Sequence, residues 1–246
     1  DRNETLFYDI VRDNIKEMAP ILYTPTVGLA CKEFGKILRR PRGMYFSSMD
    51  RGHFTAMMFN WPHDEVDIIV VTDGSRILGL GDLGSNGMGI PIGKLTLYVA
   101  CAGINPHRVL PVMLDMGTDN PELLNDPYYL GMQHPRLGED DYINAMDEFI
   151  NAVRERFPNA FIQFEDFSAE HAKKLLDRYR HKELVFNDDI QGTAGTCLSG
   201  VLSSLKVQGR PETDLSSLKI CILGGGSAGM GIAGGLCDGM VAMLLA

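Results

Sequence analysis

Apolar side chains recur at helical spacing in several stretches of the chain. Over residues 26–40 they follow Pro25, a residue that suits the first turn of a helix, and the repeating positions are Val27, Cys31, Phe34 and Leu38. Residues 139–157 carry one apolar face, made by Ile143, Met146, Ile150, Val153 and Phe157. The same reasoning predicts helices over 91–103, over 168–180 with Ser168 as the N-cap, and over 193–207.

Short, continuous apolar runs lie between these helices and predict buried strands. The runs are DIIVV (67–71), ILGLG (77–81), VLPVMLD (109–115), AFIQFED (160–166), LVFND (184–188) and KICIL (219–223), with a turn at Asp73-Gly74 between the first two. From about Val109 onward, strand and helix alternate, which predicts an α/β fold with a largely parallel sheet. Ligands of such open sheets bind beyond the carboxyl ends of the strands. The polar stretch 208–217 is interpreted as a linker.

Acidic side chains end two consecutive predicted strands. Glu165 and Asp166 end the first, and Asp188 and Asp189 end the second. If these strands are neighbours, up to four carboxylates meet at one edge of the sheet, and their repulsion favours a bound cation. Ligands that are all oxygen suit Mg²⁺ or Mn²⁺ rather than Zn²⁺. Adjacent strand residues point to opposite faces, so Glu165 and Asp166 can converge only where the strand has ended or twisted; the alternative is that these residues merely form turns and caps.

A glycine-rich loop follows the last predicted strand. Residues 224–229 (GGGSAG) satisfy the G-x-G-x-x-G pattern between an apolar strand and a helix, which is the context that dinucleotide binding requires. Gly224 would permit the tight turn, Gly226 the approach of a pyrophosphate, and Gly229 the close packing of helix on strand. The helix N-terminus, which includes Ser227 and Ala228, would supply amides and a positive dipole for the phosphates. The acidic residue expected about 20 positions further on has no strand to carry it.

Two other patterns compete with this interpretation. GLGDLG (79–84) has the same glycine spacing, but no helix opens directly after it, so a flexible or closely packed loop is predicted there. GGSAG also fits the nucleophile elbow of a hydrolase, with Ser227 as the nucleophile. That mechanism needs an acid and then a His further along, and only Asp238 follows.

Charge and composition narrow the choice of partners. The formal net charge of −9 argues against a nucleic-acid partner, because phosphate binding needs a basic surface. No apolar run has the length of a membrane span, so no membrane partner is expected. The five cysteines are dispersed and lack CxxC spacing, which fits free thiols in a reducing, intracellular compartment.

Nine segments along the chain resemble one known family, the malic enzymes. They are YTPTVG, GDLGSNGMGIPIGKL, FIQFEDF and FNDDIQGT, in this order, together with RNETLFY, RRPRGMYFSSMDRGH, NWP, VVTDG and ACAGI. The similarity runs from the first residue to the last. It implies oxidative decarboxylation of L-malate to pyruvate and CO₂, with NAD or NADP and a divalent metal (Mg²⁺ or Mn²⁺), in the cytoplasm or the mitochondrial matrix.

The resemblance also implies a role for each matching residue. Glu165, Asp166 and Asp189 correspond to the metal ligands. Tyr23 corresponds to the general acid and Lys94 to the general base, which must be neutral to accept a proton; without the resemblance, they would be interpreted as a packing residue and a solvated helix lysine. Further matches are Arg76 (substrate carboxylate and cofactor), Asp188 (a carboxylate near the metal and the lysine) and the cofactor loop Gly224, Gly226, Ser227, Ala228 and Gly229.

The resemblance implies a domain organisation as well. Residues 1–191, with a helical N-terminal segment, correspond to the substrate and metal domain, and residues 192–246 to the start of a Rossmann-like NAD(P)-binding domain. Family members continue for a few hundred residues more, so this chain is expected to be an N-terminal portion that does not oxidise malate by itself. Malolactic-type chemistry, which forms lactate with bound NAD, and a non-catalytic binding or assembly module remain as alternatives.

Self-association through the N-terminal end is also expected. Family members form dimers and tetramers, and the helical N-terminal stretch carries more apolar residues than a lone terminal helix needs. These residues are Phe7, Tyr8, Ile10, Val11, Ile15 and Met18.

Overall fold

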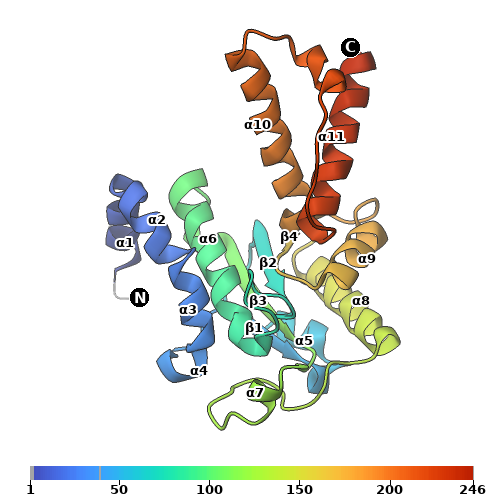
Figure 1. Cartoon of the computed structure of the whole chain (residues 1–246). Coiled ribbons are helices and arrows are strands. Elements are labelled where there is room, and N and C mark those ends of the chain that lie inside the picture. Colours follow the sequence, from blue (N-terminus) through green and yellow to red (C-terminus); the bar gives the residue numbers. More distant parts are fainter. Residues whose placement is uncertain (1–2, 39, 246) are drawn as a thin grey trace. The chain divides into compact units, whose positions relative to one another are not determined.

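The computed structural model describes residues 3–38 and 40–245. The chain divides into two compact units, Asp1–Phe167 and Ser168–Ala246; Figure 1 labels the α-helices of both and the strands β1 to β4. Among the described residues, no helix combines the length and the apolar character that crossing a bilayer requires.

A parallel sheet forms the centre of the first unit. Its strands are β1 (Met44–Ser47), β2 (Ile68–Thr72), β3 (Val109–Asp115) and β4 (Phe161–Phe164), in the order β1-β3-β2-β4. Each of these neighbouring pairs is parallel, and Ile68 of β2 stands opposite Val109 on one side and Phe161 on the other. Every residue of β2 and β3 is buried, as expected for central strands covered on both faces. The predicted α/β fold with a parallel sheet is therefore confirmed.

Helices cover both faces of this sheet. They are α1 (Glu4–Asp13), α2 (Ile15–Leu22), α3 (Thr26–Lys32), α4 (Phe34–Ile37), α5 (Phe54–Met58), α6 (Gly89–Ala102), α7 (Pro121–Leu124) and α8 (Glu139–Arg156), with short 3₁₀ turns at η1 (Ser48–Asp50), η2 (Gly84–Met88) and η3 (Pro106–Arg108). On one face, Leu95 and Val99 of α6 pack against Ile68 and Val70 of β2. On the other face, Phe149 of α8 makes an edge-to-face contact with Phe46 of β1.

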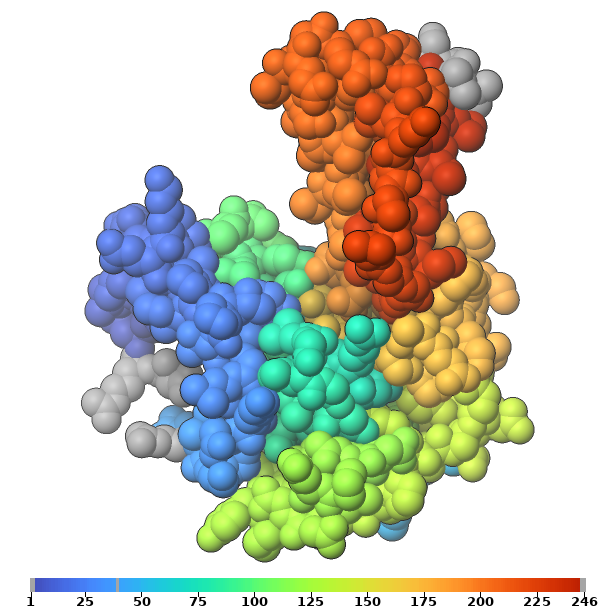
Figure 2. Space-filling model, viewed as in Figure 1, coloured from blue at the N-terminus to red at the C-terminus, as the bar shows by residue number. Residues whose placement is uncertain are grey.

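The N-terminal helices pack against the loop that leads into α6. Val27 and Cys31 of α3 form one buried cluster with Ile77, Leu83 and Ile90. Figure 2 shows these two segments, in blue and teal, meeting on one face of the first unit. This contact brings the end of α2 close to α6, where the candidate site lies.

Several predicted boundaries need correction. The helix expected over 26–40 is two helices, α3 and α4, separated at Glu33. The strand expected over 77–81 is a turn, because Leu78 (φ 51°) and Gly81 (φ 87°) adopt left-handed backbone and the Ile77 amide donates to the Gly81 carbonyl. β1 was not anticipated, because its four residues are too short a run to show alternation.

The second unit consists mainly of helices. Its elements are α9 (Ala169–Tyr179), β5 (Val185–Asn187), the π-helical turn η4 (Asp188–Gly192), α10 (Thr193–Val207), the 3₁₀ turn η5 (Glu212–Ser217) and α11 (Ser227–Leu245). Ser168 is the N-cap of α9, as predicted, and accepts a hydrogen bond from the His171 amide. Buried Leu205, Leu215 and Leu236 join α10, η5 and α11. Part of the stretch interpreted as a linker is therefore ordered as η5.

The strand predicted over 219–223 is wrong for this structure. These residues have no regular secondary structure, and the Leu223 side chain is 95% exposed. A strand needs a neighbouring backbone to bond with, and the described residues of the second unit offer none to this segment.

Candidate active site

Two residues from distant parts of the first unit converge on the carboxylate of a third. The hydroxyl of Tyr23 donates to Glu165 Oε1 at 3.1 Å. Lys94 Nζ lies 2.9 Å from the same oxygen, and it also lies 4.9 Å from the centre of the Tyr23 ring. The side chains of Lys94 and Glu165 are only 13% and 4% exposed, so this ion pair is shielded from water. The structure therefore places together the three residues for which acid, base and metal-ligand roles were expected.

Local packing explains how Tyr23 reaches Lys94. Tyr23 follows the last turn of α2, and Lys94 lies in the second turn of α6. Between them is Gly93, where an added Cβ would come within 3.0 Å of both the Leu22 carbonyl oxygen and the Tyr23 ring. A glycine at this position lets the chain around Tyr23 approach α6 closely. Burial, and then the negative charge of Glu165, raises the pKa of the Tyr23 hydroxyl, which keeps it protonated.

Asp166 has a left-handed backbone, with φ of 55°. It lies just past the end of β4, where the alternation of strand side chains no longer applies. One carboxylate oxygen of Asp166 lies within 4.8 Å of one from Glu165, and both residues are buried, at 6% and 3% exposure. Only a twisted or ended strand allows adjacent side chains to converge in this way, as anticipated from the sequence.

The Asp166 backbone and side chain also hold the loop that carries Arg76. The Arg76 amide donates to the Asp166 carbonyl at 3.3 Å, and the Leu78 amide donates to Asp166 Oδ2 at 3.1 Å. Leu78 is itself left-handed. Two residues with uncommon backbone conformations thus bond to each other next to the carboxylate pair, a type of strain that concentrates at functional sites. Arg76, which this loop carries, is exposed to solvent.

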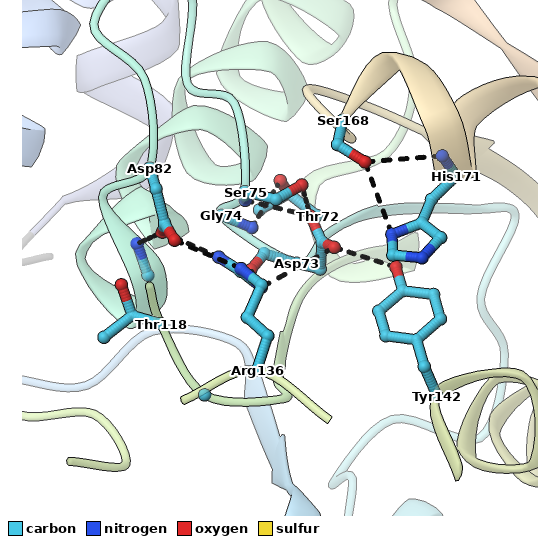
Figure 3. A network of polar contacts seen from close by, with 12 residues as sticks. Thr72, Asp73, Gly74, Ser75, Asp82, Thr118, Arg136, Tyr142, Ser168 and His171 are labelled. Atoms are coloured by element: carbon cyan, nitrogen blue, oxygen red, sulfur yellow. Dashed lines mark hydrogen bonds and ion pairs between the residues drawn. The ribbon is translucent and has the colours of Figure 1, made fainter. Parts of the chain in front are cut away.

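A buried arginine fastens both ends of this loop. Figure 3 shows the Arg136 guanidinium between Asp73, at the end of β2, and Asp82. Its Nη2 donates to Asp82 Oδ1 at 2.7 Å, and its Nη1 donates to the Asp73 carbonyl at 3.1 Å. Burial opposes the charged guanidinium, but Asp73 and Asp82 outweigh it and raise the pKa of Arg136.

Asp73 is fully buried and shares its carboxylate among several donors. Oδ1 accepts from the amide and the hydroxyl of Ser75, while Oδ2 accepts from the Tyr142 hydroxyl at 2.8 Å. Figure 3 shows these groups around Asp73. The loop from Asp73 to Asp82, which presents Arg76, is therefore fixed at both ends by ionic hydrogen bonds.

The remaining candidate residues lie in the second unit. Asp188 and Asp189 begin the π-helical turn η4, whose N-cap Asn187 accepts from the Ile190 amide. Such turns are rare and frequently occur at functional sites. The glycine-rich loop precedes α11: Gly224 has φ of 111°, and a Cβ on Gly229 would lie 2.2 Å from the Gly224 carbonyl oxygen. The Ser227 hydroxyl oxygen is buried and has no hydrogen-bond partner among the described residues.

A cleft opens beside this loop within the second unit. Its volume is about 680 Å³, and its lining comes from α9, η4, α10, α11 and the glycine-rich loop. Most of the lining is apolar or glycine; Lys173 of α9 and Arg180, which follows α9, border it, as do the carboxylates Asp177 and Asp238. The amides of a helix N-terminus, an unpartnered hydroxyl and nearby cations form a donor set that fits a phosphorylated ligand.

The donor chemistry of Glu165 and Asp166 fits a hard divalent cation. Two nearly buried carboxylates repel each other unless positive charge lies between or beside them. Lys94 supplies one such charge, 2.9 Å from Oε1 of Glu165. Oxygen ligands without sulfur or imidazole suit Mg²⁺ or Mn²⁺.

Comparison with known proteins identifies the family. Residues 1–180 match the family model of the malic enzyme N-terminal domain, and residues 190–246 match that of the malic enzyme NAD binding domain. The chain belongs to the malic enzyme family. The resemblance inferred from the nine segments is thereby confirmed.

Relatives within the malic enzyme family are similar along nearly the whole chain. The mitochondrial 59 kDa isoform of NAD-dependent malic enzyme from Solanum tuberosum is 61% identical over 94% of this chain and 39% of its own length. A mitochondrial NADP-dependent malic enzyme from Mus musculus is 50% identical over 95% of this chain and 38% of its own length. A crystal structure of Entamoeba histolytica malic enzyme matches the fold with a TM-score of 0.53 and 24% identity, over 89% of this chain and 37% of that one. The chain thus spans about two fifths of these relatives.

Sequence reasoning missed some residues at the site. It did not single out Gln163, Tyr98 or Arg136, and it missed the packing role of Gly93. Gln163 supports Glu165 and Gly93 supports Tyr23, whereas Tyr98 supports Gln163 and Arg136 supports the loop that carries Arg76. A signal for Gln163 was present: it is a polar residue inside the apolar run FIQF, two positions before Glu165 and hence on the same strand face. Arg136 carries no such signal, because its partners are 54 and 63 positions away.

Proposed function

We propose that a protein carrying this chain oxidatively decarboxylates L-malate to pyruvate and CO₂, reducing NAD or NADP. The observation that carries the proposal is the convergence of Tyr23 and Lys94 on Glu165, beside Asp166, within a family of malic enzymes. Malate loses a hydroxyl proton, a hydride and CO₂, and its third carbon gains a proton, so the reaction needs one base and one acid in balance.

Glu165 and Asp166, with Asp189 from the second unit, would hold the divalent metal. When bound, Mg²⁺ or Mn²⁺ supplies Lewis-acid polarisation of the hydroxyl and the adjacent carboxylate of the substrate. Support for the ligand set comes from the burial and convergence of Glu165 and Asp166 and from the all-oxygen chemistry of the three residues. Asp188 would be a neighbouring carboxylate that does not bind the metal directly.

Lys94 and Tyr23 would share the proton transfers. Lys94 is charged in the ion pair with Glu165 and would have to lose that proton before it takes the hydroxyl proton of malate, as a hydride leaves for the nicotinamide. Tyr23 gives a proton to the carbon that CO₂ has left, and its raised pKa means that the hydroxyl carries this proton at neutral pH. Both side chains contact one oxygen of Glu165, which supports their action on one substrate. Arg76, presented by the fastened loop, would bind a substrate carboxylate and approach the cofactor.

The glycine-rich loop and α11 would bind the dinucleotide. Gly224, Gly226, Ser227, Ala228 and Gly229 provide the turn, the helix N-terminus and an unpartnered hydroxyl. We propose residues 1–191 as the substrate and metal domain and 192–246 as the start of the cofactor domain. The choice between NAD and NADP stays open in this proposal, because similar relatives are named for each.

Assembly and location follow from the same family likeness. Leu6, Phe7 and Ile10 of α1 are 53%, 36% and 47% exposed, and we propose that this surface joins copies in a dimer or tetramer. Val11, which was expected to contribute, is fully buried inside the unit. The mitochondrial and hydrogenosomal names of several relatives support an intracellular location, in the mitochondrial matrix rather than the cytoplasm.

The test uses a full-length protein in which this chain continues as in its relatives. The wild type should form NAD(P)H and pyruvate in equal amounts from malate, and only with Mg²⁺ or Mn²⁺. Asp166→Asn should abolish measurable Mn²⁺ binding in a calorimetric titration, because an amide tolerates the left-handed backbone but removes the charge. Asp189→Ala should do the same.

The matched control is Asp177→Asn, an exposed carboxylate paired with Lys173. Its Mn²⁺ affinity should equal that of the wild type. Undiminished Mn²⁺ affinity in Asp166→Asn or Asp189→Ala would refute the ligand assignment, and lactate in place of pyruvate would favour malolactic chemistry.

A further inference from the structure

Helix α6 reaches strand β4 through two side chains, not one. Lys94 and Tyr98 are four positions apart and therefore lie on the same helix face, one turn from each other. Gln163 and Glu165 are two positions apart on the other side of the contact, on one face at the end of β4. Lys94 binds Glu165 directly, and the Tyr98 hydroxyl lies 2.5 Å from Gln163 Oε1.

Gln163 in turn binds Glu165. Its Nε2 donates to Glu165 Oε2 at 2.5 Å, while Lys94 and Tyr23 occupy Oε1 of the same carboxylate. Both oxygens of Glu165 are therefore held, each by different partners. A carboxylate with contacts on both oxygens cannot rotate about its terminal bond without losing the contacts of at least one oxygen.

The donor and acceptor groups fix the direction of each hydrogen bond in the series from Tyr98 through Gln163 to Glu165. An ionised carboxylate can only accept, so the amide nitrogen of Gln163 must face Glu165. The amide oxygen then faces Tyr98, whose hydroxyl must donate. Reversing the amide would set an oxygen against a carboxylate and leave the NH₂ group facing the hydroxyl.

Burial makes this arrangement costly to disturb. Gln163 is fully buried and Glu165 is 3% exposed. A buried amide that loses a partner is destabilising, so the Tyr98 hydroxyl is needed to satisfy the oxygen of Gln163 once its nitrogen faces Glu165. An apolar residue such as Leu would fill the same space in the strand without that need.

We propose that Gln163, oriented by Tyr98, is a positioning residue that fixes the carboxylate of Glu165 for metal binding. The inference rests on the proposed function, because it takes Glu165 as a metal ligand. Partners that orient metal ligands from behind typically contribute 10–100-fold to metal affinity. Neither Gln163 nor Tyr98 has to touch the substrate for this role.

The test measures Mn²⁺ dissociation constants of the full-length protein by calorimetric titration, together with the melting temperature. Gln163→Leu should weaken Mn²⁺ binding about 10–100-fold. Tyr98→Phe, which removes one hydroxyl and keeps the ring, should weaken it less, by about three- to tenfold. The double variant should bind no more weakly than Gln163→Leu alone, because Tyr98 acts only through Gln163.

Thr96→Val is the matched control on the same helix. Its hydroxyl is also buried, but it bonds within α6 to the Ile92 carbonyl, so its loss should leave the Mn²⁺ affinity unchanged. At saturating Mn²⁺, Gln163→Leu should regain most of its turnover, which a general loss of structure would not allow. If Gln163→Leu does not fold, the Mn²⁺ affinity of Tyr98→Phe compared with that of Thr96→Val still tests the proposal.

The outcomes separate this inference from the proposed function. Wild-type Mn²⁺ affinity in both Gln163→Leu and Tyr98→Phe, with binding lost in Asp166→Asn, would overturn the inference and leave the metal site standing. Absence of Mn²⁺ binding by the wild type would overturn the proposed function itself. If the losses of Mn²⁺ affinity in the two single variants added up in the double variant, Tyr98 would not act through Gln163.

Discussion

The two candidate sites of the chain differ in how far their polar groups are already satisfied. Around Glu165, the hydroxyl of Tyr23, the ammonium of Lys94 and the amide of Gln163 all have partners and little exposure. Around the glycine-rich loop, the Ser227 hydroxyl has no partner among the described residues, and a Cβ on Gly224 would meet no atom within 4 Å.

This difference indicates two ways of preparing a site. Charged side chains gathered away from water must hold one another in place, so the carboxylate site is assembled by tertiary packing within the first unit. Backbone amides at a helix N-terminus carry their charge without such packing, and the loop can stay open for a ligand. Substitutions should therefore act on chemistry and folding in the first region, and on ligand affinity in the second.

The largest effect is expected from Lys94→Ala. In the full-length protein it should lower kcat about 10²–10⁴-fold with little change in the malate KM, since general-base catalysis is typically worth that much. Lys36→Ala, an exposed lysine paired with Glu33, is the control and should behave like the wild type. A higher KM with normal kcat would make Lys94 a binding residue and contradict the assigned role.

The next effect is structural, from Arg136→Met. Removing the guanidinium leaves Asp73 fully buried without that partner and frees both ends of the Arg76 loop. Loss of one partner from a buried ionic group costs about 3–5 kcal/mol, measurable by urea denaturation. Arg12→Met, at an exposed ion pair, should cost less than about 1 kcal/mol. Equal stability of the two variants would show that the loop is held by other contacts.

The smallest effect is expected from Gly229→Ala in the second region. The added Cβ would lie 2.2 Å from the Gly224 carbonyl oxygen, so the loop must shift. The KM for the dinucleotide should rise about tenfold while Mn²⁺ affinity stays constant, as expected for a lost contact of about 1.4 kcal/mol. Gly200→Ala, on α10 with no atom near its added Cβ and outside the lining of the cleft, is the control. A loss of Mn²⁺ binding in Gly229→Ala would mean that the two regions are not independent.

Much of the fold could be predicted from the sequence because it depends on local periodicity. The helices over 139–157, 168–180 and 193–207 match α8, α9 and α10, and the run VLPVMLD matches β3 residue for residue. The strands predicted over 77–81 and 219–223 do not form, for reasons that local periodicity does not reveal. The run 77–81 is apolar but bends through left-handed residues, and among the described residues of the second unit 219–223 has no strand with which to bond.

The candidate site was only partly predictable, for a related reason. The acidic pair at the end of a strand could be located because parallel strands end at one edge of the sheet. Its supporting residues depend on contacts between distant segments: Tyr23 lies 142 positions from Glu165, and Tyr98 lies 65 positions from Gln163. Arguments from spacing reach neighbours on one helix or strand, whereas these contacts are set by the packing of α2 on α6 and of α6 on the sheet.

The spacing of Lys94 and Tyr98 on α6 limits how the chain can change its length. Each residue advances a helix by roughly 100°, so inserting or deleting one residue between them would turn one side chain away from β4. On β4, a single inserted residue between Gln163 and Glu165 would send one of the two to the opposite face of the sheet. Among related sequences, insertions and deletions should therefore occur in other segments, such as the loop around α7. Segments 94–98 and 163–165 should keep their length even where the residue types differ.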